Sequence, residues 1–381
     1  MIAPGSWSYP TTIHFGAGSI AKLADSCAAL GIKSPLLVTD RGLKDAPITA
    51  RALGVLKDGG LRSALFAEVD SNPHEGNLAD GIAVFKAGGY DGIVAFGGGS
   101  GLDLGKLIAF MARQTRPVWD FEDIGDWWTR ADASVIAPIM AVPTTAGTGS
   151  EVGRAAVLTN AETQQKKIIF HPKLLPGQVI ADPELTVSMP AAVTAGTGLD
   201  AFAHCVEAFS SPHYHPMSHG IALEGMRLVL DYLPRAYVTP DDIEARTHMM
   251  TVAMMGAVAF QKGLGAIHAL SHPIGAAHHT HHGTTNAVCM PAVLKFNAPA
   301  IRDRFDQAAG YLGISGGFDG FCDHVDSLNA NLGIPRKLSD LGVSDPDISK
   351  LVADALSDPS CGGNPITLDI EAVQNLLASV L

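Results

Sequence analysis

One segment constrains the fold of this chain more than any other: a buried strand, a glycine turn and a helix start follow one another at residues 91–106. The segment reads DGIVAFGGGSGLDLGK. Its consecutive glycines, Gly97 to Gly99, permit close backbone approach and positive φ angles. We expect Ser100 to cap the helix, whose exposed N–H groups and positive dipole end suit a phosphate. A plain tight turn between strand and helix is the alternative.

Two common phosphate-binding fingerprints do not fit this segment. The dinucleotide pattern GxGxxG needs glycine at Leu102, and the P-loop needs glycine at Ser100 and a hydroxyl at Leu107. A second run, PTTAGTGSE at 143–151, also follows a strand and offers hydroxyls on a flexible backbone. Two such loops at the carboxyl ends of parallel strands favour a long diphosphate ligand over a single phosphate.

Short apolar runs alternate with segments of helical spacing in the first half of the chain. The expected strands are Pro35–Asp40, Ala64–Val69, Gly92–Phe96 and Ala137–Val142. The expected helices are Ser19–Leu30, Gly76–Ala87 and Ser100–Met111. This alternation predicts a parallel sheet that is covered on both faces.

From about Pro190 onward the strand signals disappear. Long helical runs follow, at Ala191–Phe209, His219–Leu233 and Ile243–Val258. A chain of 381 residues exceeds the size at which single cores stop growing, so two domains are expected. We place an α/β dinucleotide-binding domain at 1–189 and an all-α metal-binding domain at 190–381, with a cleft between them where ligands usually bind.

Composition and charge exclude several other classes of protein. The net charge of −12 argues against a nucleic-acid surface. The five cysteines are odd in number and form no CxxC pair, which disfavours a disulfide framework and fits a reducing cytoplasm. The start, MIAPGSWSYP, lacks the pattern of a signal peptide, and no apolar stretch approaches the roughly 20 residues that span a bilayer. We therefore expect a cytoplasmic protein without a membrane partner.

Histidines concentrate in HALSHPIGAAHHTHH at 268–282, which holds six of the fifteen in the chain. His268 and His272 stand four apart, and so do Asp200 and His204 in another helical stretch. That spacing places two side chains on one helix face, about 5–6 Å apart at Cβ. One carboxylate with several imidazoles and no thiolate suits Fe²⁺ or Zn²⁺. A solvated histidine patch and buried, hydrogen-bonded histidines are the alternatives.

Asp40 ends an expected strand. An acidic residue there can accept hydrogen bonds from the ribose hydroxyls of a dinucleotide and would repel a 2′-phosphate. A helix cap or turn aspartate is the alternative interpretation.

Several long motifs, in the same order along nearly the whole chain, resemble the iron-containing (group III) alcohol dehydrogenase family. They include GGGSGLDLGK, PTTAGTGSE, the segment around Asp200 and His204, and HALSHPIGAAHHTHHG. TTIHFGAGSIAKL, KKIIFHPKLLPGQVIADPELTVSMP and GGNPITLDIEAVQNLL are similar as well. The resemblance implies an NAD(P)- and metal-dependent oxidoreductase that interconverts a small alcohol and its aldehyde or ketone. It also implies that the protein forms a homodimer.

The same resemblance implies a role for individual residues. The metal ligands would be Asp200, His204, His268 and His282, binding Fe²⁺ or else Zn²⁺. His272 would lie beside the metal and relay a proton, and Asp40 would favour NAD over NADP. The contacts to the cofactor would come from Asp40, Asn72, Gly98, Gly99, Ser100, Asp103, Thr144, Thr145, Thr148, Lys167 and Leu185.

The chain departs from the family pattern at two places. Gly153 stands where many members carry threonine, which removes one hydroxyl contact to the cofactor. The segment also contains additional histidines at positions where other members have residues that line the substrate cleft, namely His278, His279 and His281. The identity of the substrate is therefore not determined by the resemblance.

Three related activities remain as alternatives. An NAD- and metal-dependent lyase resembling dehydroquinate synthase would need several basic residues for a phosphorylated substrate, whereas Arg154 and Lys262 are the nearest in sequence to the metal motifs. Maleylacetate reductase acts without a metal, and a zinc-type glycerol dehydrogenase is disfavoured by His282. A metal-storage protein would leave the two glycine-containing loops unexplained.

Overall fold

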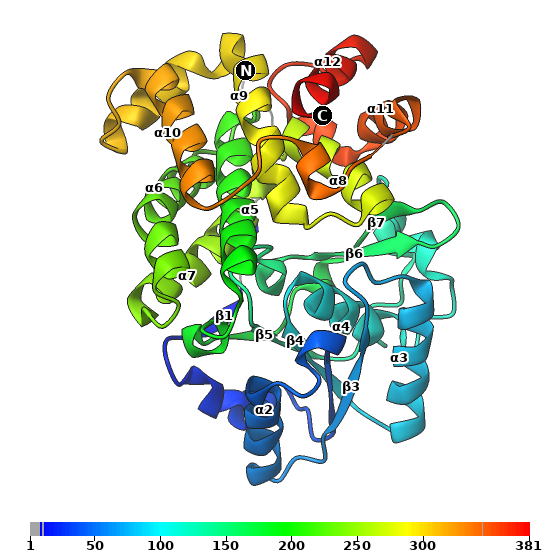
Figure 1. Ribbon diagram of the computed structural model, residues 1–381. Helices are drawn as coiled ribbons and strands as arrows, with labels where there is room; N and C mark the ends of the chain where they lie inside the picture. The colour runs from blue at the N-terminus through cyan, green and yellow to red at the C-terminus, as the bar shows by residue number, and fades with distance from the viewer. Residues whose placement is uncertain (1–7, 10, 345) are drawn as a thin grey trace. The chain divides into compact units, whose positions relative to one another are not determined.

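The computed structural model describes residues 8–9, 11–344 and 346–381. Most of the segment in which we looked for a signal peptide therefore lies outside the described residues. Two compact units are distinguished (Figure 1). The α/β unit comprises Tyr9–Thr145 and Gly149–Ser188, and the helical unit comprises Ala146–Thr148 and Met189–Leu381.

A parallel sheet forms the centre of the α/β unit. In the described part of the chain its order is β1-β8-β5-β4-β2-β3, and every neighbouring pair is parallel. The strands are β1 (Thr12–Phe15), β2 (Pro35–Asp40), β3 (Ala64–Val69), β4 (Gly92–Gly97), β5 (Ile139–Pro143) and β8 (Gln178–Ala181). The parallel sheet expected from the sequence is confirmed. Its central strands β4 and β5 are buried at every position, which explains their continuous apolar runs.

Helices cover both faces of this sheet. On one face, α1 (Leu23–Ala29) and α2 (Pro47–Asp58) share a core with alternate strand residues such as Leu37 and Val94. The other face carries α3 (Glu75–Gly88) and α4 (Gly99–Met111), and Gly105 of α4 lies directly on Ala95. The side chains of each strand alternate between these two layers.

An antiparallel hairpin stands apart from the parallel sheet and was not expected. It consists of β6 (Ala155–Asn160) and β7 (Gln165–Phe170), paired from Ala155↔Phe170 to Asn160↔Gln165. Asp103 of α4 accepts a hydrogen bond from Val157 N at 2.9 Å, which ties the hairpin to that helix.

The second unit is helical, as expected. Its helices are α5 (Ala191–Ser210), α6 (Pro216–Val238), α7 (Ile243–Ala259), α8 (Ala266–His278), α9 (His282–Tyr311), α10 (Gly317–Asn331), α11 (Ile348–Ser357) and α12 (Ile370–Val380). Helix α5 is buried almost throughout and packs against α6, α7 and α9. Helix α8 continues through Pro273 to His278. The site residues described below belong to α5, α8 and α9.

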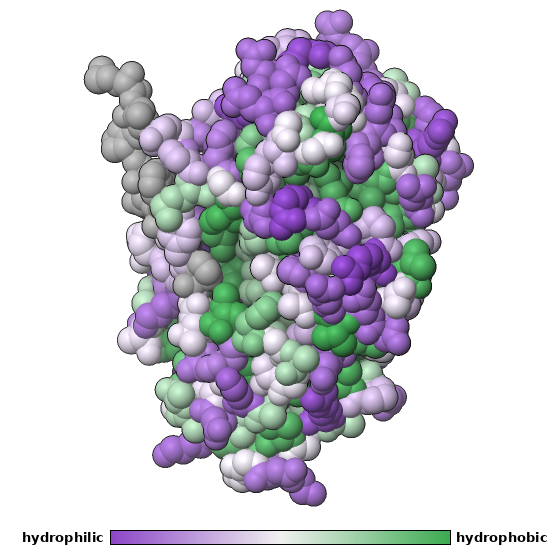
Figure 2. Space-filling model, turned by 90° about the vertical axis from the view of Figure 1, so that its left-hand side faces the viewer, coloured by the Kyte–Doolittle hydropathy of each residue, from purple (hydrophilic) through white to green (hydrophobic). Residues whose placement is uncertain are grey.

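The described helices include none that could cross a membrane alone. Ile243–Lys262 and Ala266–His278 meet the length and hydropathy requirement only as a pair bent by 111°. Hydrophilic side chains occupy much of the face shown in Figure 2, with smaller apolar groups between them.

Candidate functional site

The four metal ligands expected from the sequence converge in the helical unit. Asp200 Oδ1 lies 3.6 Å from His204 Nε2, 3.6 Å from His268 Nε2 and 3.5 Å from His282 Nε2. Asp200 and His204 come from consecutive turns of α5, His268 from the first turn of α8, and His282 from the start of α9. Asp200, His204 and His268 are each at most 5% exposed. One carboxylate oxygen thus faces three imidazole nitrogens, in a pocket that is buried except at His282, whose side chain is 26% exposed.

The spacing of these atoms fits a transition-metal ion. Four ligands about 2.0–2.2 Å from a tetrahedral centre are separated from one another by about 3.3–3.6 Å. The three distances measured from Asp200 Oδ1 lie within or at the limit of this range. The donor set of one carboxylate and three imidazoles also suits Fe²⁺ or Zn²⁺ better than Mg²⁺ or Ca²⁺.

A glycine allows His282 to reach this pocket. Gly283 is the second residue of α9. A β-carbon at this position would collide with the carbonyl of Gly196 in α5 and would lie 2.9 Å from Asp200 Cβ. The two helices therefore touch backbone to backbone at this point. A side chain at Gly283 would separate α9, with His282, from Asp200.

The protonation equilibria show that the pocket attracts positive charge. Burial opposes the ionisation of Asp200, but the surrounding histidines hold the pKa of its carboxyl well below the usual range. Burial also disfavours protonation of His268, yet the Glu207 and Asp200 carboxylates raise its pKa to about 10. Burial lowers the pKa of His204 to about 4 despite the attraction of Asp200. Two carboxylates thus set a negative potential that a divalent cation can satisfy.

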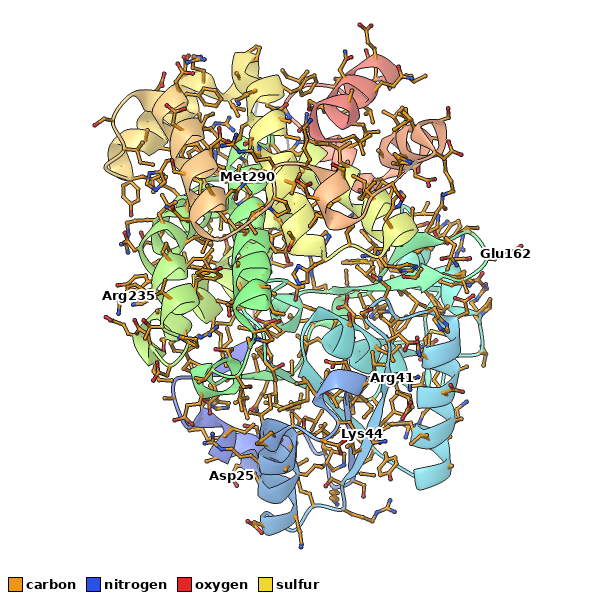
Figure 3. The ribbon with its side chains drawn as sticks, viewed as in Figure 1. Asp25, Arg41, Lys44, Glu162, Arg235 and Met290 are labelled. Carbon is orange, nitrogen blue, oxygen red and sulfur yellow. The ribbon has the colours of Figure 1, made fainter. Side chains whose placement is uncertain are left out.

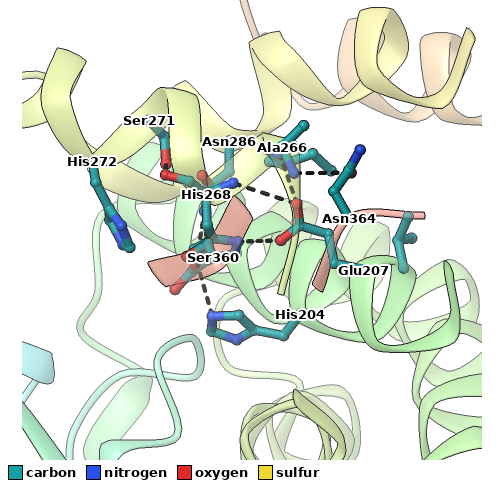
Figure 4. A network of polar contacts seen from close by, with 12 residues as sticks. His204, Glu207, Ala266, His268, Ser271, His272, Asn286, Ser360 and Asn364 are labelled. Carbon is teal, nitrogen blue, oxygen red and sulfur yellow. Dashed lines mark hydrogen bonds and ion pairs between the residues drawn. The ribbon is translucent and has the colours of Figure 1, made fainter. Parts of the chain in front are cut away.

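Glu207 contacts the site and was not predicted from the sequence. Its Oε2 lies 2.5 Å from His268 Nδ1, and its Oε1 accepts from Ile267 N at 2.7 Å (Figure 4). A carboxylate on Nδ1 fixes the tautomer that leaves Nε2 free for a metal. The available signal is weak: Glu207 lies three residues after His204 on the same helix, and a buried acid on an apolar helix requires a partner.

Asp358 is the second missed residue, and its partner is His272. His272 Nδ1 lies 2.8 Å from Asp358 Oδ2, and Asp358 Oδ1 accepts from Ser360 N at 2.8 Å. Burial opposes ionisation of Asp358, but His272 lowers the pKa of its carboxyl to about 2. The His272 ring stacks on that of His282, with centroids 5.3 Å apart. His272 therefore lies next to the expected metal ligand His282, with its Nδ1 engaged by a carboxylate.

The additional histidines of the segment have local roles. His281 caps α9 by accepting from Thr284 N, and His279 has a left-handed φ of 54° at the end of α8. Both are exposed, and His278 is half-buried. The structure thus separates the histidines around the pocket from those that shape the α8–α9 turn.

The two glycine-containing loops begin side by side at the edge of the parallel sheet. They follow adjacent strands, with Gly97 of β4 paired to Pro143 of β5, and Thr144 N donates to Gly97 O at 2.9 Å. Gly97 has a φ of 140°, which favours glycine. A β-carbon on Gly98 would lie 3.1 Å from Thr145 Cγ2, so the loops also touch. The expected pair of loops at the carboxyl edge of the sheet is therefore present.

The expected cap at Ser100 is wrong. Helix α4 begins at Gly99 with Gly98 as its N-cap and has no side-chain cap, while Ser100 Oγ donates to Ser71 O at 2.7 Å. Because α4 starts only two residues after the end of β4, Ser100 is already the second residue of the helix and does not occupy the N-cap position. The first N–H groups of α4 are consequently not bound by a capping side chain, which suits an anion.

Asp40 lies at the end of β2, next to β4 in the sheet. Its Oδ1 caps the short helix Arg41–Leu43 by accepting from Leu43 N at 3.2 Å, as in the alternative interpretation. Its Oδ2 lies 3.4 Å from where a β-carbon of Gly97 would be, so the carboxylate also faces the glycine turn. The neighbouring Arg41 binds Glu68 and Asp70 instead (Figure 3).

Polar side chains of α4 contact the second of these loops. Lys106 Nζ donates to Ser150 O at 3.0 Å and to Ser150 Oγ at 2.7 Å, and the same hydroxyl donates to Asp103. Asp103 thus faces these groups, although it is among the expected cofactor contacts. A β-carbon at Gly153 would make only ordinary contacts, so packing does not require glycine there.

The remaining expected cofactor contacts lie in different surroundings. Asn72 follows β3, Lys167 in β7 pairs with Glu122 at 3.7 Å, and Leu185 is buried in the short helix Pro183–Thr186. Thr148 belongs to the helical unit.

Comparison with known proteins gives matches along most of the chain. The family model described as iron-containing alcohol dehydrogenase matches residues 10–183, and the C-terminal model of the same family matches 194–381. A 4-hydroxybutyrate dehydrogenase of Cupriavidus necator is 41% identical over 367 residues, covering 94% of each chain.

Two solved structures are also similar. A 1,3-propanediol oxidoreductase has a TM-score of 0.93 at 34% identity, covering 99% of this chain and 100% of the other. A sulfoacetaldehyde reductase of Bifidobacterium kashiwanohense in complex with NAD⁺ has a TM-score of 0.89 at 28% identity, covering 99% of each chain. These relatives are named as dehydrogenases, oxidoreductases or reductases, which supports oxidoreductase chemistry over the lyase alternative.

Proposed function

Because this chain belongs to the family of iron-containing alcohol dehydrogenases, whose members interconvert alcohols and carbonyl compounds, we propose the residues that perform this reaction here. One divalent cation would be held by Asp200, His204, His268 and His282. The observation that carries this assignment is the convergence of three imidazole nitrogens on Asp200 Oδ1 within 3.6 Å. Fe²⁺ is the proposed ion, with Zn²⁺ as the alternative, because both accept this donor set.

The bound cation would polarise the substrate oxygen and make its hydroxyl more acidic, while the nicotinamide would exchange the hydride. The protein contributes orientation and proton transfer. Glu207 holds the proton of His268 on Nδ1, so that Nε2 keeps its lone pair for the ion. Asp358 does the same for His272, which leaves His272 Nε2 to accept and release the proton of the reaction.

NAD is the proposed cofactor, and all but one of its proposed contacts belong to the α/β unit. The contacts would be those named from the family resemblance, namely Asp40, Asn72, Gly98, Gly99, Ser100, Asp103, Thr144, Thr145, Thr148, Lys167 and Leu185. Support comes from the uncapped start of α4 and the adjoining loop after β5. Burial raises the pKa of the Asp40 carboxyl, and its Oδ2 faces the glycine turn. Its negative charge would disfavour the 2′-phosphate of NADP.

The proposed substrate is a small primary alcohol with a second polar group at its far end, such as a hydroxy acid or a diol. By their names, the relatives described above act on 4-hydroxybutyrate, 1,3-propanediol and sulfoacetaldehyde. The first two are primary alcohols with a second polar group, and the third is an aldehyde whose reduction gives such an alcohol. We further propose that the enzyme is a cytoplasmic homodimer, with its α/β domain at 1–189 and its helical domain at 190–381.

An NAD-reduction screen tests this function. The metal-loaded protein is assayed with 4-hydroxybutyrate, with 1,3-propanediol, and with 1-butanol as a four-carbon alcohol that lacks the second polar group. We expect NADH formation, with a kcat/KM for 4-hydroxybutyrate at least about tenfold above that for 1-butanol, since a polar contact discriminates more strongly than a methylene. Absence of NADH with every alcohol would contradict the proposed activity, and a preference for 1-butanol would contradict the substrate class.

A further inference from the structure

Asn286 is a fully buried residue with no function assigned to it so far. It lies on α9 one turn after His282, so the two side chains share a helix face. Its Nδ2 lies 2.8 Å from Asp200 Oδ1, 3.2 Å from His268 Nε2 and 3.3 Å from His282 Nε2. Figure 4 shows Asn286 beside His268. One amide group thus contacts ligand atoms from three helices.

We propose that Asn286 is a positioning residue of the metal site, which orients the ligand atoms of Asp200, His268 and His282 and thereby strengthens metal binding. The inference rests on the proposed metal ligands and concerns a residue outside that set. It follows from the contacts of a single carboxamide.

The contact with Asp200 is the strongest of the three. At 2.8 Å it is a short hydrogen bond from an amide to an ionised carboxylate, a class stronger than bonds between neutral groups. Oδ1 has more than one lone pair, so it can accept from Asn286 and bind a cation at the same time. The bond would therefore persist in the metal-loaded enzyme and keep Oδ1, rather than Oδ2, directed at the three imidazoles.

The contacts with the imidazoles hold the rings in place. Glu207 contacts Nδ1 of His268 while Asn286 contacts Nε2 of the same ring, so this ring is held on both sides. The amide also lies 3.3 Å from His282 Nε2, which brings the proposed ligand nitrogens of α8 and α9 to the same side of Asp200. Each Nε2 has a single lone pair, which would pass to the ion on metal binding, so the hydrogen bond to Asp200 is the contact that would remain.

The other end of the carboxamide supports a specific role. Among the described residues, Asn286 Oδ1 has no hydrogen-bond partner, although it is buried. A buried acceptor without a partner costs about 1–3 kcal/mol, so an apolar side chain would be more stable here if packing alone mattered. This cost is explained if the NH₂ group orients the proposed metal ligands that it contacts.

Metal affinity of two variants tests the proposal. Asn286→Leu keeps the side-chain volume and removes the donors, and Asn286→Ala removes the whole carboxamide. The matched control is Asn329→Ala, because Asn329 is also a buried asparagine, 8% exposed, whose Nδ2 donates to Ala287 O of α9 at 2.8 Å. Chelator competition gives the dissociation constant for Zn²⁺, thermal unfolding reports folding, and the absorption of Co²⁺ bound in place of Zn²⁺ reports the ligand geometry.

We expect both Asn286 variants to bind Zn²⁺ about 10–100-fold more weakly, with an altered Co²⁺ spectrum, as for other residues that orient metal ligands. Asn329→Ala should keep the wild-type affinity even where its melting temperature falls. Unchanged or tighter Zn²⁺ binding in the folded Asn286→Leu protein would overturn the proposal. A wild-type protein that binds no stoichiometric metal would instead contradict the proposed function, so the two failures are distinguishable.

Discussion

The carboxylate of Glu207 contacts His268 at the ring nitrogen opposite to the one that faces Asp200, with 2.5 Å between Oε2 and Nδ1. The same carboxylate accepts from Ile267 N at the start of α8. It therefore fixes both the imidazole and the helix that carries it.

Glu207→Gln should weaken metal binding about 10–100-fold, because a neutral amide neither polarises the imidazole nor retains the negative charge beside it. Glu184→Gln is the control, since Glu184 pairs with Arg51 on an exposed surface of the α/β unit. The dissociation constant of Zn²⁺ for the two variants is the measurement. Equal affinity in Glu207→Gln and the control would refute a role for this contact.

His272→Ala should retain its metal and lose rate. A positioned general acid–base contributes about 10²–10⁴-fold, so kcat should fall within that range and its pH profile should change. Asp358→Asn should produce a smaller loss, because His272 remains but its Nδ1 is no longer held by a carboxylate. Metal analysis together with pH–rate curves checks both variants. A pH–rate curve of His272→Ala that superimposes on that of the wild type would remove the proton role.

Asp40→Gly should relax the cofactor preference towards NADP. The substitution removes the charge that repels a 2′-phosphate, and it also removes the cap on Leu43 N. The ratio of kcat/KM for NAD over NADP is the measurement, and it should fall at least about tenfold. If the wild-type enzyme already prefers NADP, the interpretation of this carboxylate is wrong.

Glu151 should make the stability of the protein depend on pH. Burial, with a smaller contribution from the Asp103 carboxylate, raises the pKa of the Glu151 carboxyl from 4.5 to about 7, although the charge of Lys106 opposes this shift. Between these pH values the unfolded chain has lost this proton while the folded chain retains it. The free energy of unfolding should therefore fall as pH rises from about 4.5 to 7, by about 3 kcal/mol in total at about 1.4 kcal/mol per pH unit.

The variant Glu151→Gln should abolish most of that decrease. Urea unfolding at pH 5 and pH 8 measures it, with Glu162→Gln as a control at an exposed turn of the hairpin (Figure 3). The difference in the free energy of unfolding between pH 5 and pH 8 should become smaller only in Glu151→Gln. The same difference in the wild type and in Glu151→Gln would show that the group is not buried as described.

Buried strands were the easiest elements to predict from the sequence. Pro35–Asp40 has the predicted bounds, because a strand covered on both faces favours a continuous apolar run. Ala64–Val69 also has the predicted bounds, although it is an edge strand of the sheet and contains Glu68. The hairpin at 155–170 was missed for two reasons. Its second strand, QKKIIF, does not alternate polar and apolar residues, and the connection between the two strands lacks the residues typical of a tight hairpin turn. Helix α2 was missed as well. Its apolar positions are interrupted by charged ones, and tertiary packing determines its state.

The four proposed metal ligands could be named from the sequence, since spacing indicates Asp200, His204 and His268 while His282 follows from the family motifs alone. The structure brings the four side chains together. Their supporting residues could not be predicted in this way. Asp358 lies 86 residues from His272 and Glu207 lies 61 from His268, so only tertiary structure reveals these pairs. Asn286 shares a helix with His282, but nothing in the sequence shows that its amide reaches α5 and α8.

The most direct measurement of the central claim is the metal content of His268→Ala beside the wild type and His281→Ala. His281 lies in the same histidine-rich segment but is exposed and caps α9. We predict one divalent ion per chain in the wild type and in His281→Ala, none in His268→Ala, and NADH binding in all three. Chelation should abolish alcohol oxidation by the wild type, and adding Fe²⁺ or Zn²⁺ should restore it. Full turnover in a metal-depleted preparation, or undiminished metal content in His268→Ala, would contradict the account.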